Sequence, residues 1–215
     1  MPDIELVNPS IEQYAERSTT PEPAALKEIN EQTFAHHAHA HMLSGHVQGR
    51  LLSFLSNIIK PRYVLEIGTF TGYSALCLAE GLEEGGQVHT IEIRDEDADT
   101  SLKNFKAAGK EKHITLHRGN AVDIIPTLPH LWDMVFIDAD KTGYINYYEI
   151  IVPRLSAKGV IIADNTFFHG QVLEQPITGK NAIAIDAFNN HILNDDRVEQ
   201  VMLTMRDGLL IIKNK

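Results

Sequence analysis

Several features that mark other protein classes are scarce in this 215-residue sequence. It holds one cysteine, Cys77, so no disulfide can form within the chain, and such usage fits a reducing compartment. Cys77 lies in an apolar stretch that begins a predicted helix, which indicates a buried packing residue rather than a reactive thiol. Lysine and arginine total 19 against 29 acidic residues and form no block. The net charge of −10 therefore argues against a nucleic acid partner.

Long apolar runs are missing as well. No stretch approaches the ~20 apolar residues that a membrane span needs, so we expect no membrane partner. Met1–Glu5 have neither the basic residues nor the apolar core of a secretion signal, and we expect a cytoplasmic protein. Length and a hydrophobic fraction of 43% favour one globular domain over residues 1–215.

Hydrophobic patterning separates a helical N-terminal extension, residues 1–60, from an α/β body. In the extension, Thr20 and Pro21 resemble the N-cap and first position of a helix, and apolar residues recur at helical spacing over 51–59. From Tyr63 onward, short apolar runs alternate with helical stretches. Strands are expected at 63–67, 88–93, 114–117, 134–137 and 160–163, and helices near 73–84, 95–109, 120–128, 141–155 and 180–194.

The last part of the chain predicts a β-hairpin. Residues 198–205 and 209–212 are strand-like and flank Asp207-Gly208, a pair typical of two-residue turns. The preceding βαβ alternation implies a parallel sheet with right-handed crossovers. We therefore predict a Rossmann-like α/β fold, in which a seven-stranded, mostly parallel sheet carries helices on both faces and ends in an antiparallel hairpin.

Acidic and amide side chains follow two of the predicted strands. Asp138 comes after 134–137, and Asp164 and Asn165 end the run 160–163. Ligands of open α/β sheets bind outside the carboxyl ends of the strands, so these side chains should meet at one edge. Three hard oxygen ligands suit Mg²⁺, or Mn²⁺ or Ca²⁺, and leave about half of some six positions for substrate and water. Lys141 can reach the same place.

Each of these residues also has a plainer interpretation. Asp138 could serve only as a helix N-cap, and Asp164-Asn165 could form an ordinary turn. Lys141 could be a solvated helix residue. Phe167 and Phe168 could pack under a loop or clamp a substrate.

A glycine turn follows the first predicted strand, in Val64-Leu-Glu-Ile-Gly-Thr-Phe-Thr-Gly-Tyr-Ser74. Its G-x-x-x-G spacing lacks the third glycine of the dinucleotide fingerprint, and Glu66 would repel a pyrophosphate. Glu92, at the end of the second predicted strand, can accept both ribose hydroxyls of an adenosine. S-adenosylmethionine fits this pattern, because it has an adenosine, a sulfonium and an ammonium but no phosphate. A turn without a ligand and a surface charge at Glu92 are the alternatives.

From about Met42 to its C-terminus the chain resembles the cation-dependent class I O-methyltransferases, which include catechol O-methyltransferase and caffeoyl-CoA O-methyltransferase. Residues 64–74 resemble the first motif of that family, and 136–141 and 163–166 resemble its metal and catalytic motifs. The resemblance implies that Asp138, Asp164 and Asn165 bind the metal and that Lys141 is the general base. It implies cofactor contacts for Met42, Leu43, Ser44, Glu66, Gly68, Phe70, Tyr73, Ser74, Glu92, Ile93, Ala121 and Asp138.

Two positions place the chain nearer the caffeoyl-CoA-like branch of that family. Ala121 has no hydroxyl, so only its backbone N–H would serve the adenine, and Asp140 stands where animal catechol enzymes carry an aromatic residue. The resemblance implies methyl transfer to a phenolic small molecule with vicinal hydroxyls, and a homodimer. The charge of −10 favours small neutral or cationic catechols over coenzyme A thioesters.

Two other functions share parts of this pattern. A nicotinamide-dependent oxidoreductase is disfavoured by the missing third glycine and by Glu66. A cofactor-binding module without catalysis would not need Asp138, Lys141, Asp164 and Asn165 together. The histidines of His36–His41 lack a nearby carboxylate or cysteine, so a pH-sensitive subunit contact is preferred there over a metal site.

Overall fold

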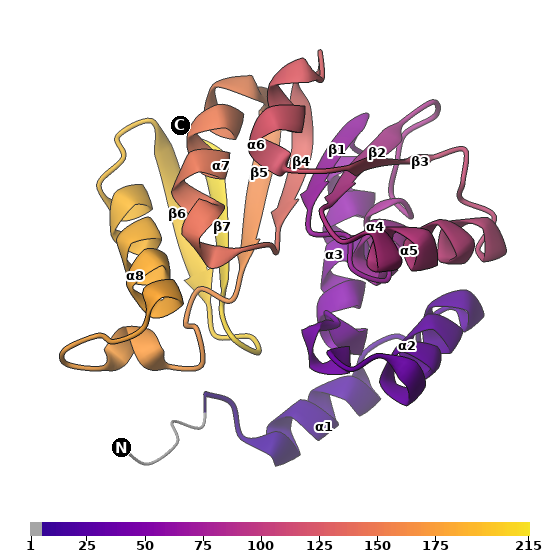
Figure 1. Cartoon of the computed structure of the whole chain (residues 1–215), viewed down its shortest axis with the longest axis horizontal. Coiled ribbons are helices and arrows are strands. Elements are labelled where there is room, and N and C mark those ends of the chain that lie inside the picture. Colours follow the sequence, from indigo (N-terminus) through magenta and orange to yellow (C-terminus); the bar gives the residue numbers. More distant parts are fainter. Residues whose placement is uncertain (1–5) are drawn as a thin grey trace.

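A seven-stranded sheet with the order β3-β2-β1-β4-β5-β7-β6 forms the centre of the molecule (Figure 1). The computed structural model describes residues 6–215, so the expectation about Met1–Glu5 falls outside it. The strands are β1 (Tyr63–Ile67), β2 (Gln87–Glu92), β3 (Ile114–Arg118), β4 (Trp132–Ile137), β5 (Leu155–Asp164), β6 (Val198–Leu203) and β7 (Leu209–Asn214). β1 to β5 pair in parallel, and β7 runs antiparallel to β5 and β6. The predicted fold class is confirmed.

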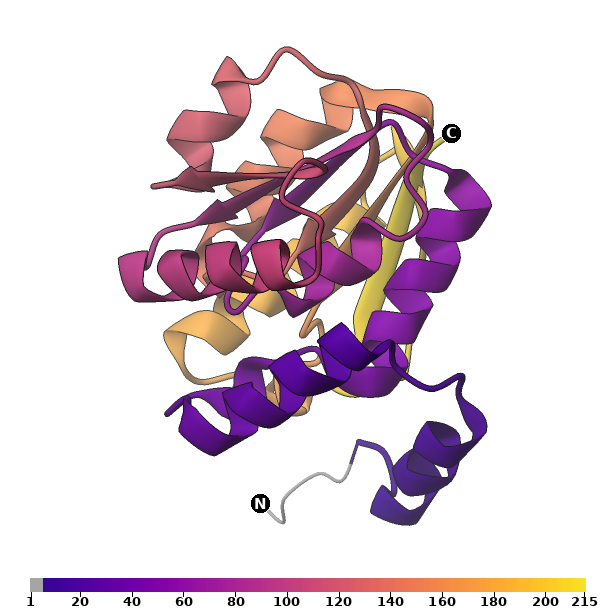
Figure 2. The same cartoon turned by 90° about the vertical axis from the view of Figure 1, so that its right-hand side faces the viewer.

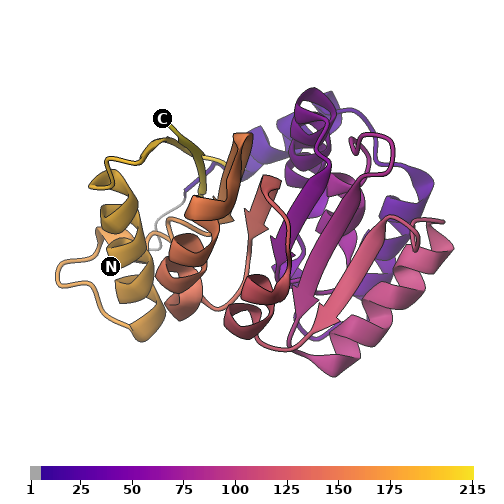
Figure 3. The same ribbon diagram turned by 90° about the horizontal axis from the view of Figure 1, so that it is seen from above.

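Helices cover both faces of the sheet, as Figure 2 shows for α3 on one side and α7 on the other. One face packs against α3 (Gly45–Ile59), α4 (Tyr73–Leu78) and α5 (Asp95–Ala107), and the other against α6 (Ala121–Ile124), α7 (Tyr144–Ile151) and α8 (Lys180–Leu193). Side chains alternate between the faces, so that Leu65 and Ile67 join the α7 side while Val64 joins the α3 side. α8 and β3 lie near opposite ends of the molecule (Figure 3). Short 3₁₀ turns lie at Ala40–Met42, Ile125–Thr127, Lys141–Gly143, Val152–Arg154 and Gln171–Leu173.

The N-terminal extension is helical, but one predicted helix start is wrong. α1 (Pro9–Ser18) is capped by Asn8, and α2 (Ala24–His36) begins after Pro23, so Thr20 and Pro21 start no helix. The chain stays outside helical conformation through Pro23, and a proline disfavours helical backbone at the residue before it, here Glu22. The Glu22 carboxylate accepts hydrogen bonds from Tyr73 Oη (2.5 Å) and Asn30 Nδ2 (3.4 Å). This contact holds the extension beneath the body of the molecule (Figures 1 and 2).

Several strand boundaries also differ from the predictions, most of all the start of β5. β5 begins at Leu155 rather than Val160, and its pairing with β4 shifts between Trp132 and Met134, near the exposed residues Ala157 and Lys158. In the hairpin, Leu203 pairs with Leu209, so residues 204–208 form the connection and the expected two-residue turn is wrong.

Cys77 is fully buried in α4, as predicted, and burial raises the pKa of its thiol to about 12. None of the helices within residues 6–215 combines the length and apolarity that a bilayer span needs.

Candidate active site

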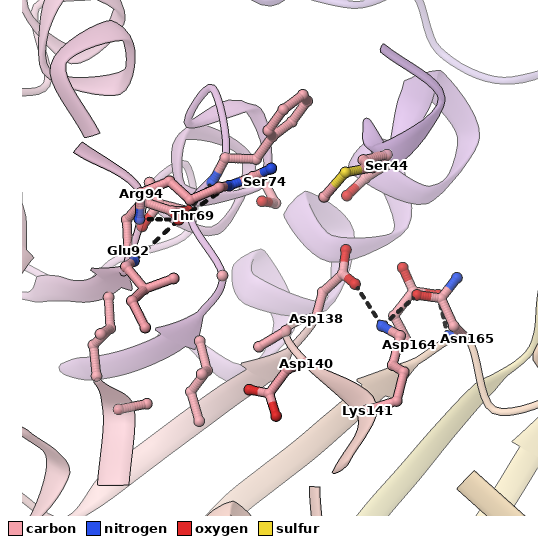
Figure 4. Close-up of a pocket in the computed structure, with 18 of the residues that line it drawn as sticks. Ser44, Thr69, Ser74, Glu92, Arg94, Asp138, Asp140, Lys141, Asp164 and Asn165 are labelled. Carbon is pink, nitrogen blue, oxygen red and sulfur yellow. Dashed lines mark hydrogen bonds and ion pairs between the residues drawn. The ribbon is translucent and has the colours of Figure 1, made fainter. Parts of the chain in front are cut away.

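Neighbouring strands end side by side at the centre of the sheet. Their register places one residue from the end of each of β2, β1, β4 and β5 in a single row: Glu92, Gly68, Asp138 and Asp164. The strand order reverses between β1 and β4, and such a switch point opens a crevice. A cleft of about 600 Å³ lies over this row (Figure 4).

Gly68 lets the loops after β1 and β4 touch. Its φ of +98° is rare for other residues, and a Cβ at this position would lie 1.9 Å from the Asp138 carbonyl oxygen. The glycine turn therefore brings the end of β1 against the first predicted metal ligand.

Glu92 organises one end of the cleft through its carboxylate. Oε2 accepts a hydrogen bond from the Phe70 backbone N–H (2.8 Å), and Oε1 accepts from the N–H groups of Ile93 (3.0 Å) and Arg94 (2.9 Å). The residue is 5% exposed and lines the cleft. Each carboxylate oxygen can accept two bonds, so Oε2 keeps capacity for a ligand hydroxyl. The alternative that Glu92 is only a surface charge at the end of a strand does not fit this burial and these three hydrogen bonds.

Glu66 lies behind the glycine turn and does not line the cleft. It is fully buried and accepts a hydrogen bond from Thr90 Oγ1. Burial raises the pKa of its carboxyl to about 8. The carboxyl is therefore largely neutral at neutral pH, which weakens the argument that it repels a pyrophosphate. Its predicted contact with the cofactor stays a prediction.

Lys141 binds the acidic end of the row, where the sequence predicts it. Its ammonium donates to Asp138 Oδ1 (3.1 Å), Asn165 Oδ1 (2.7 Å) and Tyr144 Oη (2.8 Å). Burial opposes its charge, but the Tyr144 hydroxyl and the Asp138 carboxylate outweigh this and raise the pKa of Lys141 above its ordinary value. The lysine is not solvated, and in this arrangement it is a cation.

Asp164 is held from two sides. Its Oδ2 accepts from Gln48 Nε2 (2.7 Å) and its Oδ1 from the Asn165 backbone N–H (2.7 Å). Burial, together with the charge of Asp138, raises the pKa of Asp164 above its ordinary value. Two carboxylates near one another with one lysine make this end a place that favours a further cation.

Most residues predicted from the sequence line the cleft together. They are Met42, Leu43, Ser44, Gly68, Phe70, Tyr73, Ser74, Glu92, Ile93, Ala121, Asp138, Lys141, Asp164 and Asn165. Phe168 lines it too and also packs on the core, whereas Phe167 does not line it.

Several residues that line the cleft were not predicted as site residues. The sequence marks Asp140 only as a departure from the animal catechol enzymes and Asn120 only as a neighbour of Ala121; Asp140 accepts a hydrogen bond from Tyr147, and Asn120 N-caps α6. Asn181 and Arg206 come from α8 and the β6–β7 connection, far along the chain, and no local pattern marks them. Arg206 donates to the Leu43 carbonyl (3.0 Å) and so ties that connection to the segment before α3.

The histidine cluster does not form the shared helix face that a metal site would need. α2 ends at His36, and His37 bonds to Asp97 (3.0 Å), while His41 lines the cleft. Over the described residues, one group of three metal-type side chains comes together outside the cleft: Glu149, His191 and Asp195. The guanidinium of Arg197 already pairs with Glu149 (2.8 Å) and Asp195 (2.6 Å) there.

Comparisons with known proteins agree with this geometry. The sequence model of the O-methyltransferase family matches residues 15–215. Caffeoyl-CoA O-methyltransferases of Stellaria longipes and Medicago sativa are 31% and 30% identical, over 86% and 89% of this chain and 80% and 82% of theirs.

Solved structures show the same fold with a cofactor product bound. A methyltransferase of Podospora anserina with SAH (S-adenosylhomocysteine) matches with a TM-score of 0.90 and 30% identity, over 100% of this chain and 98% of that one. An O-methyltransferase of Bacillus cereus in complex with SAH matches with a TM-score of 0.85 and 28% identity, over 96% and 97%. This chain belongs to the O-methyltransferase family and is an S-adenosylmethionine-dependent enzyme of that family.

Proposed function

We propose that this enzyme methylates one hydroxyl of a vicinal dihydroxy aromatic molecule, with a divalent cation held by Asp138, Asp164 and Asn165. The observation that carries the proposal is the placement of these side chains around the Lys141 ammonium at one end of the cleft (Figure 4). The other end of the same cleft holds Glu92. One cavity thus joins an adenosine-type subsite to a cation-type subsite.

The cofactor is proposed to lie along the row of strand ends. Its ribose would bind Glu92, with the adenine against Ile93 and the backbone of Ala121. Its methionine part would lie by Ser74 and the segment Met42–Ser44, which Arg206 contacts through its hydrogen bond to the Leu43 carbonyl. The methyl group would then face Asp138 and Lys141.

The donor set fits a hard divalent cation. Asp138, Asp164 and Asn165 offer carboxylate and amide oxygens, the ligands that Mg²⁺ and Mn²⁺ prefer. The Lys141 ammonium already bonds to two of the three, and this contact supports the proposal that their oxygens attract a cation. A divalent cation bound there favours the ionised form of a hydroxyl that it contacts.

Lys141 is the proposed proton acceptor for the hydroxyl. The ammonium keeps its proton while it bonds to Asp138, Asn165 and Tyr144. Asp138 and Asn165 would hold the cation with the same oxygens that Lys141 now contacts, and the like charge of a cation there would lower the pKa of Lys141. Tyr144 keeps the amine in place, since its hydroxyl is buried and also donates to the Asp164 backbone oxygen (3.1 Å).

The acceptor is proposed to be a catechol-type ring. Three protein oxygens leave about three of six positions free on Mg²⁺, and adjacent hydroxyls can fill two of them. Phe168 and Met42 supply apolar surface to the lining of the cleft. A catechol carried on a coenzyme A thioester is the second candidate, favoured by the names of the relatives and by Arg206 in the cleft wall.

Metal removal tests the proposal. Methyl transfer to a catechol should cease in excess chelator and return with Mg²⁺ or Mn²⁺. Asp164→Ala should behave like chelation and still bind SAH, whereas Asp133→Asn, a buried aspartate at the other end of the sheet that binds the N–H groups of Arg62 and Tyr63, should keep its metal response. Full activity in chelator would refute the cation site.

A further inference from the structure

The connection between β6 and β7 reaches the loop that carries Asn165. Asp207 Oδ2 accepts a hydrogen bond from Asn165 Nδ2 (3.2 Å), and Oδ1 accepts from the His169 backbone N–H (2.6 Å). The Asp207 carbonyl accepts from the Phe167 N–H (2.9 Å). Asp207 does not line the cleft, so any effect on the reaction passes through these partners.

The carboxylate of Asp207 decides which end of the Asn165 amide faces the cleft. A carboxylate only accepts hydrogen bonds, so the NH₂ group of Asn165 turns toward it and Oδ1 turns toward Lys141 Nζ, at 2.7 Å. The opposite orientation would set NH₂ against an ammonium and oxygen against a carboxylate. Both bonds would become repulsions, and the face toward the cation site would lose its donor oxygen.

The backbone around Asn165 needs such support. Asn165 has φ +57°, and Phe168, His169 and Gly170 follow in left-handed conformations with φ of +44°, +56° and +77°. Conformations of this kind persist where the surroundings fix them. Asp207 bonds to the Asn165 side chain and to the His169 backbone, and so clamps this run at both ends.

Gly208 makes the close approach possible. A Cβ there would lie 2.7 Å from the Phe167 ring and 2.7 Å from Thr166 Oγ1, and φ is +86°. The Gly208 carbonyl also accepts from the Thr166 N–H (3.2 Å). The pair Asp207-Gly208 therefore serves contact with the site loop rather than a two-residue hairpin turn.

We propose that Asp207 is a positioning residue of the methyl-transfer site, which fixes the Asn165 amide with its oxygen toward the cation. This inference rests on the cation site proposed above. Partners that orient a metal ligand typically change metal affinity by about 10- to 100-fold when they are lost.

The test exchanges the carboxylate of Asp207 and the amide of Asn165. Asp207→Asn is nearly isosteric and keeps an oxygen for the His169 N–H, but it presents NH₂ to the NH₂ of Asn165. We expect calorimetric Mn²⁺ affinity to fall by about 10- to 100-fold, while SAH affinity stays within about twofold. In the double variant Asp207→Asn with Asn165→Asp, the new amide donates to the new carboxylate, and Mn²⁺ affinity should recover. Asp186→Asn, on α8 outside the cleft, is the matched control.

Each result decides the inference. Wild-type Mn²⁺ affinity in Asp207→Asn would overturn it, as would a double variant that binds SAH but does not recover Mn²⁺ binding. If Asp207→Asn does not fold, the double variant alone decides. A wild-type enzyme that binds SAH but no Mn²⁺ would refute the cation site itself, and the role of Asp207 with it. Mn²⁺ affinity in the double variant above that of Asn165→Asp alone is a result that a merely structural role for Asp207 would not produce, because a carboxylate at 165 offers the cation an oxygen in either orientation.

Discussion

Replacing Glu92 with alanine should weaken S-adenosylmethionine binding by about 10- to 150-fold. The proposed bond to the ribose would join a neutral donor to a charged acceptor, and such bonds contribute about 1.5–3 kcal/mol. At 1.4 kcal/mol for each decade of the dissociation constant, this range gives the stated factor. The three backbone N–H groups that Glu92 holds, from Phe70, Ile93 and Arg94, also lose their acceptor.

Two further variants separate ligand binding from loop support. Glu92→Gln keeps one acceptor oxygen, so its loss of affinity should lie between wild type and Glu92→Ala. Glu80→Gln removes a carboxylate that pairs with Arg50 (2.6 Å) outside the cleft, and it should lower stability without changing cofactor affinity. Isothermal titration with S-adenosylmethionine measures the cofactor affinity of all three variants, Glu92→Ala, Glu92→Gln and Glu80→Gln. A folded Glu92→Ala protein with a wild-type dissociation constant would refute the assignment of the ribose to Glu92.

Three more predictions follow from the site and the sheet. Lys141→Ala should lower turnover by about 10²- to 10⁴-fold with little change in cofactor affinity, and normal turnover at neutral pH would contradict its role as base. Gly68→Ala should cost about 2 kcal/mol or more of stability and abolish cofactor binding, because its Cβ meets the Asp138 carbonyl; a variant that melts like wild type would count against this contact. His89 stacks on His117 and has the His130 ring tilted beside it, and burial, with the charges of His130 and His117, lowers its pKa to about 4. The unfolded chain then binds more protons between pH 4 and about 6.5, so the unfolding free energy should decrease as the pH is lowered through this window, by about 1–2 kcal/mol after allowance for partial exposure. Urea unfolding at pH 7 and pH 5 should show this slope, and it should flatten in His89→Gln.

The hydrophobic pattern of the sequence predicts those strands that are buried along nearly their whole length. Short apolar runs at 63–67 and 134–137 become β1 and β4 with the expected bounds or nearly so, because buried parallel strands are apolar on both faces. The first half of β5 gave no such signal, since Ser156 and Lys158 are polar and Ala157 and Lys158 are exposed, next to a shift of register with β4.

The site residues also fall into two groups, those that the sequence pattern predicts and those that it does not. Asp138, Asp164 and Glu92 follow strands, and the parallel sheet brings such residues together whatever lies between them. Gln48 and Asp207 reach Asp164 and Asn165 across the fold from α3 and the β6–β7 connection. Their roles depend on tertiary packing, and no spacing in the sequence encodes them.

The central claim is that adjacent hydroxyls of one ring bind a cation held by Asp138, Asp164 and Asn165. Its most direct test compares a catechol with its monohydroxy analogue, using labelled S-adenosylmethionine with Mg²⁺ and with chelator. We predict that the catechol reacts at least about tenfold faster with Mg²⁺, since 1.4 kcal/mol of transition-state binding gives that ratio, and that chelator removes the difference. Equal rates for the two acceptors in the presence of Mg²⁺ would contradict the account.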